Sequence, residues 1–174
     1  MNNQLAEYLI IPETITQIRS EAFKNCSFIR EIFISDSVTY IGDEAFSGVG
    51  NLSKLVLPKH IDYFGSSNFY GNEIQNITLP ETINSGMENF YFNGFDTIIH
   101  IRSLESYLNL NLRFYSRFLY LDNEPIVELK IPDGITIIRK EAFQKNENIK
   151  TVTLPNTIET IESSAFSECS SLES

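Results

Sequence analysis

The sequence predicts an α/β solenoid of about seven stacked coils, built from short strands and short helical turns. The first observation behind this prediction is a phrase that recurs with the same internal spacing at residues 11–29, 131–149 and 154–172. Each copy opens with an apolar residue and proline, has isoleucines three and six residues after the proline, and then carries an Ala-Phe pair. The second observation is the period, since Pro132 and Pro155 lie 23 residues apart. Self-similarity at such a period is typical of stacked repeats in which each coil contacts only its neighbours.

The coils can be aligned on the proline position. The residues one and three places before it are apolar in every coil and alternate with residues that point the other way, which predicts a short strand with one buried face. Proline ends this strand, because it cannot donate a hydrogen bond to a ladder. A second short strand is expected around the apolar residues three and six places after the proline, such as Ile15 and Ile18. The aligned positions are Pro12, Ser35, Pro58, Pro80, Arg102, Pro132 and Pro155.

The Ala-Phe pairs, which lie ten and eleven residues after the aligned position, predict the closing side of each coil. A small residue beside a large one, as at 45–46, is interpreted as a turn of helix whose ring fills the interior. With one ring per coil, the phenylalanines should stack in a column in which Phe46 lies between Phe23 and Phe69. In the fourth coil, Phe90-Tyr91 stands where the Ala-Phe pair belongs.

An insert interrupts the regular spacing, because the step from Arg102 to Pro132 is 30 residues. The first part of the insert predicts a short amphipathic helix with Ser103 as its N-cap. The inward residues of this helix would be Leu104, Tyr107 and Leu108. The second part predicts a hairpin in which 118–121 and 126–131 flank a turn at 122–125.

These elements make up one predicted domain, 1–174, with regular coils at 8–101 and 129–174 on either side of a helix-hairpin insert at 103–128. A solenoid needs polar caps, because its end coils otherwise expose their apolar interior. No such cap is evident in the sequence, which predicts that the chain is part of a longer repeat array.

The repeated phrase resembles the BspA-like leucine-rich repeats of bacterial surface proteins, which also occur in some protozoan parasites. The similarity lies in Ile-Pro-x-x-Ile-x-x-Ile-x-x-x-Ala-Phe-x-x-Cys-x-x-Leu at residues 11–29, 34–52 and 154–172. The segments 104–110 and 119–132 also look like an irregular segment that this family uses. The resemblance implies a right-handed superhelix with a parallel strand ladder on its concave face, secretion or surface display, and a role in adhesion or protein binding. It implies no particular ligand and no catalytic residue.

Composition excludes several classes of partner. The chain has 13 Lys and Arg against 23 Asp and Glu, a net charge of −10, so nothing basic is clustered to neutralise nucleic-acid phosphates. No stretch approaches the ~20 apolar residues that span a bilayer, so no membrane insertion is expected. The segment 1–7 is polar and lacks a signal peptide, which keeps a cytoplasmic location open beside the surface location that the family implies.

Chemistry-bearing residues are sparse, and we predict no catalytic, cofactor-binding or metal-binding residue. His60 and His100 lie two coils apart with no acid-base partner fixed by spacing, and both are interpreted as surface residues. No His, Cys and Asp set has metal-ligand spacing, and no Gly-rich phosphate loop is present. Cys26 and Cys169 fall at the same corner of coils six apart, roughly 29 Å at the strand spacing, which is too far for a disulfide.

The candidate functional site is the outer face of the first three strands. Residues two and four places before the aligned position point away from the core. They form an apolar and aromatic stripe that is typical of protein contacts, with charged residues at its rim. The alternative is that a flanking segment or a second copy covers this stripe, through face-to-face or end-to-end self-association. The stripe consists of Tyr8, Ile10, Phe33 and Val56, and its rim of Glu31 and Lys54.

Function is therefore predicted to be that of a non-catalytic interaction module with an unidentified protein partner and no cofactor. Two other classes stay open. One is a structural spacer that holds another domain away from a surface, and the other is a repeat region attached to an enzyme domain elsewhere. Flanking sequence would discriminate them, since a leader and a wall anchor favour adhesion and an adjoining catalytic motif favours the enzyme.

Overall fold

The computed structural model describes residues 7–86, 96–110, 112 and 117–173. The chain divides into two compact units, residues 1–94 and 95–174, and each is described by itself. Both are β-solenoids in which short parallel strands stack coil on coil, and α1 (Leu104–Asn109) is the one helix among the described residues. The predicted pair Phe90-Tyr91 lies outside them.

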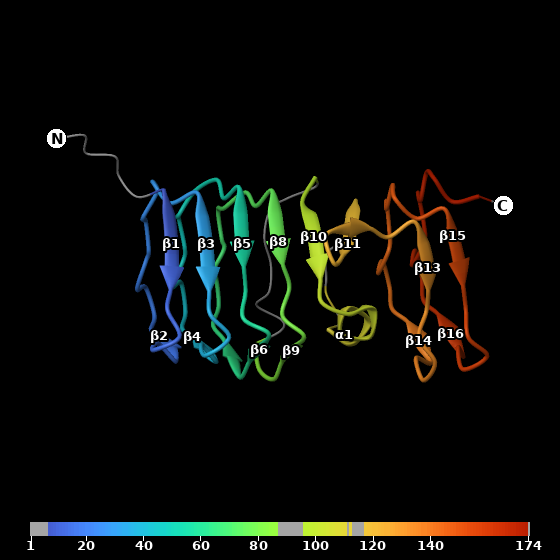
Figure 1. The fold of residues 1–174 in the computed structure, drawn as a ribbon, viewed down its shortest axis with the longest axis horizontal. Helices are drawn as coiled ribbons and strands as arrows, with labels where there is room; N and C mark the ends of the chain where they lie inside the picture. Colours follow the sequence, from blue (N-terminus) through green and yellow to red (C-terminus); the bar gives the residue numbers. More distant parts are fainter. Residues whose placement is uncertain (1–6, 87–95, 111, 113–116, 174) are drawn as a thin grey trace. The chain divides into compact units, whose positions relative to one another are not determined.

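The first wall of unit 1 is a parallel ladder in the order β1 (Tyr8–Ile11), β3 (Glu31–Ile34), β5 (Lys54–Val56) and β8 (Asn76–Thr78), as Figure 1 shows. The coils stack in register, so the inward residues Ile32, Leu55 and Ile77 are adjacent and fully buried. Each strand ends at or before the aligned position, as the proline pattern predicts. The predicted ladder strands of these coils are confirmed.

A second wall follows each ladder strand. In unit 1 it contains β2 (Gln17–Ile18), β4 (Tyr40–Ile41) and β7 (Tyr63–Phe64) in one parallel sheet, and β6 (His60–Ile61) with β9 (Thr82–Ile83) in another. Ile41 and Phe64 are fully buried here, because the apolar residue six places after the aligned position points inward. The predicted second run of short strands is confirmed.

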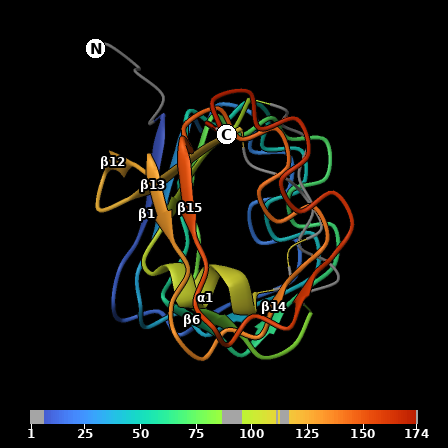
Figure 2. The same cartoon turned by 90° about the vertical axis from the view of Figure 1, so that its right-hand side faces the viewer.

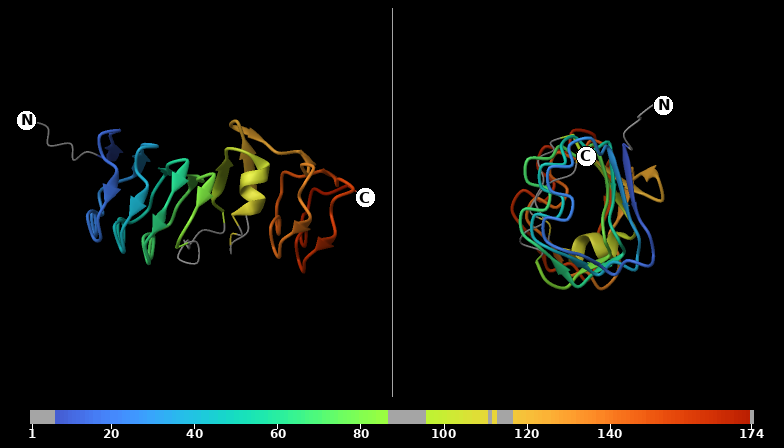
Figure 3. Two further views of the ribbon diagram at one scale, coloured as in Figure 1. Left: turned by 90° about the horizontal axis from the view of Figure 1, so that it is seen from below. Right: turned by 90° about the vertical axis from the view of Figure 1, so that its left-hand side faces the viewer.

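The third wall differs from the prediction, because the Ala-Phe segments form successive turns rather than helical turns. The N–H groups of Ala22 and Lys24 bond back to carbonyls three residues earlier in the same coil. The N–H groups of Glu21, Phe23 and Asn25 instead donate to carbonyls of the next coil at 2.8–2.9 Å. This alternation bonds each turn to the neighbouring coil as in a pair of strands. A helix would have used all these groups within one coil. Figure 3 (left) shows the coils of unit 1, blue to green, lying side by side.

Two positions adopt the left-handed backbone conformation in each of the five coils whose third wall the structure describes, those aligned on Pro12, Ser35, Pro58, Pro132 and Pro155. They lie nine and thirteen residues after the aligned position, and they reverse the chain so that it can alternate between own-coil and next-coil bonds. Glycine is the residue that takes this conformation without a steric cost, and other residues here carry strain. The residues are Glu21, Asn25, Glu44, Gly48, Ser67, Gly71, Glu141, Lys145, Ser164 and Glu168.

The predicted phenylalanine column is confirmed in unit 1. The rings of Phe23 and Phe46 stack at 5.5 Å with an interplanar angle of 4°, and those of Phe46 and Phe69 at 5.8 Å with 8°. Phe46 has no exposed surface, whereas Phe23 is half-buried. In unit 2, Phe143 and Phe166 stack at 5.2 Å.

Unit 2 contains the insert. The helix α1 is confirmed, because the Ser103 hydroxyl accepts a hydrogen bond from the Ser106 N–H at 3.1 Å, and Tyr107 and Leu108 are buried. Leu104 is only half-buried. Before and after this helix, β10 (Ile98–Ile101) and β11 (Phe118–Leu121) pair in parallel, so the insert adds a ladder strand of its own.

The predicted hairpin is present, but its turn is tighter than predicted and its second arm is wrong in part, since 128–130 of the predicted arm 126–131 pair with 151–153 instead of with β11. Its turn is the pair Asp122 and Asn123, with φ of 53° and 65°, which is typical of a two-residue hairpin turn. The next two residues form β12 (Glu124–Pro125), antiparallel to β11, so they belong to the hairpin and not to its turn. Figure 2 shows β12 projecting beyond the wall that β13 (Glu128–Lys130) and β15 (Thr151–Thr153) form.

The regular part of unit 2 repeats the architecture of unit 1. Strands β13 and β15 pair in parallel, as do β14 (Ile137–Ile138) and β16 (Thr160–Ile161). Leu129 and Ile138 are fully buried. In the coil that follows, Leu154 and Ile161 are 41% and 48% exposed although they occupy inward positions.

Candidate functional site

The six predicted site residues lie together on the outer face of β1, β3 and β5. Register places Ile10 beside Phe33 and Phe33 beside Val56, and it places Tyr8 beside Glu31 and Glu31 beside Lys54. Tyr8 and Ile10 are each 61% exposed, and Phe33 and Val56 are half-buried. We call this set of six the strand-face patch.

Electrostatics tie the rim of the strand-face patch to its centre. The Lys54 ammonium lies 5.4 Å from the centroid of the Phe33 ring, within the range of a cation–π contact. Glu31 stands between Tyr8 and Lys54 in the same row. The patch therefore offers one partly covered aromatic ring, two exposed apolar side chains and both signs of charge, a composition suited to protein recognition.

A second group of outward residues lies on β10 and β11, and its two members on β11 were not expected to join the ladder. On β10 and β11, Ile98 is in register with Phe118, and His100 with Tyr120, whose rings lie 5.4 Å apart. All four side chains are half-buried. The signal that could have revealed them is the alternation of 118–121, but the insert was not expected to extend the ladder. His100 is therefore a packed residue rather than a freely exposed one.

The structure gives His60 partners that spacing did not predict. Its Nε2 lies 3.0 Å from Asp62 Oδ1, its Nδ1 bonds to the Thr82 hydroxyl, and the Asn84 amide donates to the same Asp62 oxygen at 3.0 Å. Hydrogen bonds from Thr39 and His60 lower the pKa of Asp62.

This cluster contains the residue types of a hydrolytic triad. The side chains of His60 and Asp62, however, are 48% and 55% exposed. A triad aspartate is buried and orients a histidine at a substrate cleft. We therefore interpret the His60 cluster as a hydrogen-bond network on the surface.

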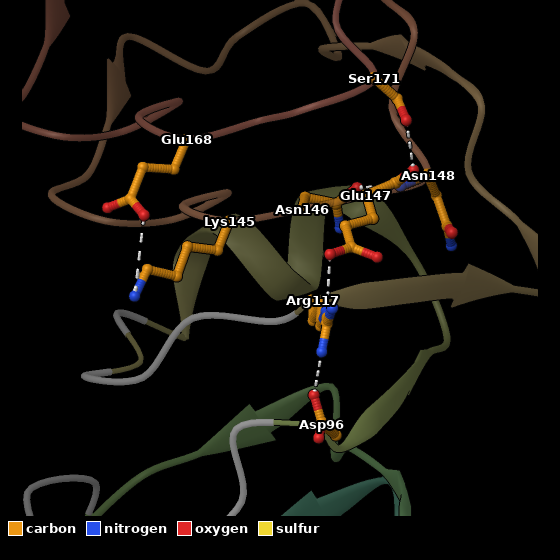
Figure 4. Close-up of polar contacts among 8 residues, drawn as sticks. All are labelled: Asp96, Arg117, Lys145, Asn146, Glu147, Asn148, Glu168 and Ser171. Carbon is orange, nitrogen blue, oxygen red and sulfur yellow. Dashed lines mark hydrogen bonds and ion pairs between the residues drawn. The ribbon is translucent and has the colours of Figure 1, made fainter.

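A charged cluster in unit 2 has a structural role (Figure 4). The Arg117 guanidinium donates to Asp96 and, at 2.7 Å, to Glu147, and the Glu147 N–H donates to the Arg117 carbonyl at 2.9 Å. These hydrogen bonds raise the pKa of Arg117. The Ser171 hydroxyl donates to the Glu147 carbonyl at 2.8 Å. Arg117, in the insert, thus connects Asp96, which precedes β10, to Glu147 in the coil after the insert.

Neither cysteine is bridged, and Cys26 belongs to unit 1 and Cys169 to unit 2. The Cys169 thiol donates to the Phe143 carbonyl at 3.1 Å, and partial burial raises its pKa. Across the described ranges, no group of three or more His, Cys, Asp or Glu side chains could hold a metal ion. In the same ranges, no helix has the length and apolar character needed to cross a membrane.

Comparison with known proteins adds the family. No curated protein sequence matches the chain. Similar solved structures include a leucine-rich repeat protein from Bacteroides ovatus, with 24% identity, 95% of this chain and 54% of that one covered, and a TM-score of 0.47. A leucine-rich repeat protein from Eubacterium ventriosum has 16% identity and a TM-score of 0.45, with 96% of this chain and 59% of that one covered. A leucine rich cell surface protein from Faecalibacterium prausnitzii has 19% identity and a TM-score of 0.42, with 95% of this chain and 59% of that one covered. The chain spans little more than half the length of each of them.

A family model also matches the whole chain. A BspA type leucine rich repeat region matches residues 1–118 and 115–174, in six copies. The stacked coils, the register of their ladder strands and the phenylalanine column are what such a repeat requires. The chain therefore belongs to the family of BspA-type leucine-rich repeat proteins.

Proposed function

We propose that this chain is a non-catalytic protein-interaction module that binds a protein partner through the strand-face patch. The observation that supports it most is the exposure of Tyr8 and Ile10, at 61% each, in register with Phe33 and Val56. Water contact with such apolar surface is unfavourable, so covering it with a partner is a source of binding free energy.

Phe33 is the proposed anchor of the contact. It lies in the middle strand of the patch, between Ile10 and Val56, and the Lys54 ammonium lies over its ring. Central aromatic residues surrounded by a less important rim carry most of the energy in protein interfaces. The net charge of −10 favours a partner with a basic surface over a second copy of this chain.

Display outside the cell is part of the proposal and is supported by the family. A structural spacer would need no such patch, and an enzymatic role would place the chemistry in another part of a larger protein. The His60 cluster, with both its acid and its base about half exposed, supports the non-catalytic role.

The proposal can be tested with a displayed library of extracellular proteins selected against the whole chain. A partner obtained in this way is titrated against wild type, Phe33→Ala and the control Tyr70→Ala, whose side chain is 70% exposed and lies outside the patch. We expect Phe33→Ala to weaken binding by about 2 kcal/mol or more and Tyr70→Ala to leave it unchanged.

Equal affinities of wild type and Phe33→Ala would contradict the proposal. Sedimentation of the free chain provides the second measurement. A dimer that Phe33→Ala dissociates would assign the patch to packing between two copies instead.

A further inference from the structure

Strand β13 of unit 2 has one unpaired edge within the described ranges. Among the described residues, β13 pairs with β15 on one side and with no strand on the other. The Val127 carbonyl and the Ile131 N–H both bond toward β15. Because backbone groups alternate in direction along a strand, those of Glu128 and Lys130 point to the opposite side.

Equivalent residues in other coils show what is missing. The N–H of Glu31 donates to Glu7, that of Lys54 to Arg30 and that of Thr151 to Val127, at 3.1–3.4 Å. Glu128 occupies the same place in its coil, and within the described ranges its N–H has no such partner. The edge of β13 therefore presents backbone hydrogen-bond donors and acceptors that no neighbouring strand pairs with.

The insert causes this break in the ladder. β12 pairs with the edge of β11 through Leu121 and Glu124, and the Ile126 N–H donates to the Leu119 carbonyl at 2.9 Å. The hairpin thereby fills the edge of β11 that β13 would otherwise use. Figure 2 shows that β12 projects away from β13 and β15 instead of lying between the ladder strands.

An open groove of about 550 Å³ lies along this edge. Its apolar lining comes from Leu104 of α1, from Leu121 and Pro125 of the hairpin, and from Val127, which is 38% exposed. The groove therefore combines an apolar floor with an unpaired strand edge, which are the two parts of a site that binds an extended peptide as an added strand.

Charge selects the kind of occupant. Glu124, Glu128 and Lys130 line the groove, and Lys130 already lies 3.4 Å from the Glu128 carboxylate. The lining thus carries one net negative charge, and within the described ranges Glu124 forms no ion pair, whereas Glu128 does. A segment with a basic side chain complements this lining, whereas a second copy of a chain of net charge −10 does not.

We propose that β13 receives an extended segment of a partner protein as an added strand. Alternate side chains of this segment are apolar and enter the groove, and a lysine or arginine pairs with Glu124 or Glu128. The backbone of the segment bonds to Glu128 and Lys130. This site lies in unit 2 and is separate from the strand-face patch of unit 1.

The test uses random linear heptapeptides displayed on phage and selected against the whole chain. A selected peptide is synthesised and titrated by fluorescence anisotropy against wild type, Lys130→Pro and the matched control Lys130→Ala. Proline removes the groove-facing N–H and leaves the bonds of Leu129 to β15 in place, whereas alanine keeps the N–H. We expect affinity to fall at least tenfold in Lys130→Pro and to change less than threefold in Lys130→Ala, and Phe33→Ala to have no effect.

Charge is tested with Glu124→Gln and Glu128→Gln, at least one of which should weaken binding fivefold or more at low salt. Where Lys130→Pro lowers the unfolding midpoint, peptides N-methylated on alternate amides replace it, and only the set that blocks one edge should lose binding. The proposal is overturned by equal affinities of the two Lys130 variants together with equal affinities of the two methylated sets. Failure to select any peptide, or a dimer of the free chain that Lys130→Pro dissociates, also overturns it.

Discussion

The phenylalanine column gives the sharpest stability prediction, because its members differ in burial in a way that the structure specifies. Phe46 is fully buried between two parallel rings, at 5.5 and 5.8 Å. Phe46→Ala should therefore lose the full burial of a large side chain, leave a cavity that two flat neighbours cannot fill, and cost about 3–5 kcal/mol in free energy of unfolding. Phe23 has one stacked neighbour and is half-buried, so Phe23→Ala should cost about half as much.

The assay is urea unfolding of the whole chain followed by far-UV circular dichroism. Phe28→Ala is the control, since that ring is 63% exposed and its loss should change the free energy by no more than about 0.5 kcal/mol. The double variant of Phe23 and Phe46 should reveal a coupling energy of about 0.5–1.5 kcal/mol from ring stacking. A cost below about 1 kcal/mol for Phe46→Ala, or equal costs for Phe23 and Phe46, would refute the interior column.

Three further predictions concern other features of the coils. Gly65→Ala should lower the melting temperature much more than Gly71→Ala, because a Cβ on Gly65 would lie 2.4 Å from backbone atoms of the preceding coil. At Gly71 the space is open, so alanine is opposed by the φ of 76° alone, which costs about 1–2 kcal/mol. Mass spectrometry of the unreduced protein should find no crosslink between Cys26 and Cys169. Alkylation of Cys169 at pH 8 should be slower in the native protein than in the unfolded chain, because the raised pKa of the thiol lowers the thiolate fraction. A crosslink would contradict the first expectation, and equal alkylation rates the second. Because the pKa of Asp62 is lowered in the folded state, its ionised carboxylate stabilises the fold above the ordinary carboxyl pKa, and this stabilisation is lost as pH falls through the folded-state pKa. Asp62→Asn should therefore flatten the pH dependence of the melting temperature below pH 4. An unchanged slope would exclude a contribution of Asp62 to stability.

Spacing predicted the parts of the fold that depend on periodic burial. The ladder strands before Pro12, Ser35 and Pro58 follow from apolar alternation, and the ring column follows from one phenylalanine per coil. Strand β11 was predicted as an arm of the hairpin, but its parallel pairing with β10 was not, because Ile98 is in register with Phe118 after only 20 residues. A short coil inside a long insert has no periodic signal of its own.

Backbone conformation was harder to predict than burial. Most of the left-handed positions are occupied by glutamate, serine, asparagine or lysine, and these residue types do not indicate a positive φ from the sequence. Gly48 and Gly71, which occupy the same position in successive coils, were the available signal for turns in place of a helix.

The two candidate sites also differ in how far the sequence predicts them. The alternation of side chains was sufficient to predict that Phe33 and its neighbours lie on the outer face. The unpaired edge of β13 arises because β12 folds back on β11, and that pairing depends on the tight turn at Asp122 and Asn123. No local pattern in 128–130 indicates it.

A methyl NMR titration of the isoleucine- and valine-labelled chain with a selected protein partner shows whether the partner binds at the strand-face patch. Binding through the strand-face patch predicts that the methyl resonances of Ile10 and Val56 shift or broaden on addition of the partner, while those of the fully buried Ile138 do not. Val127, in the groove of unit 2, reports on the second site independently. Shifts at Ile10 and Val56 that disappear with Phe33→Ala would support the account. A partner that binds while both of these resonances stay unchanged would contradict it.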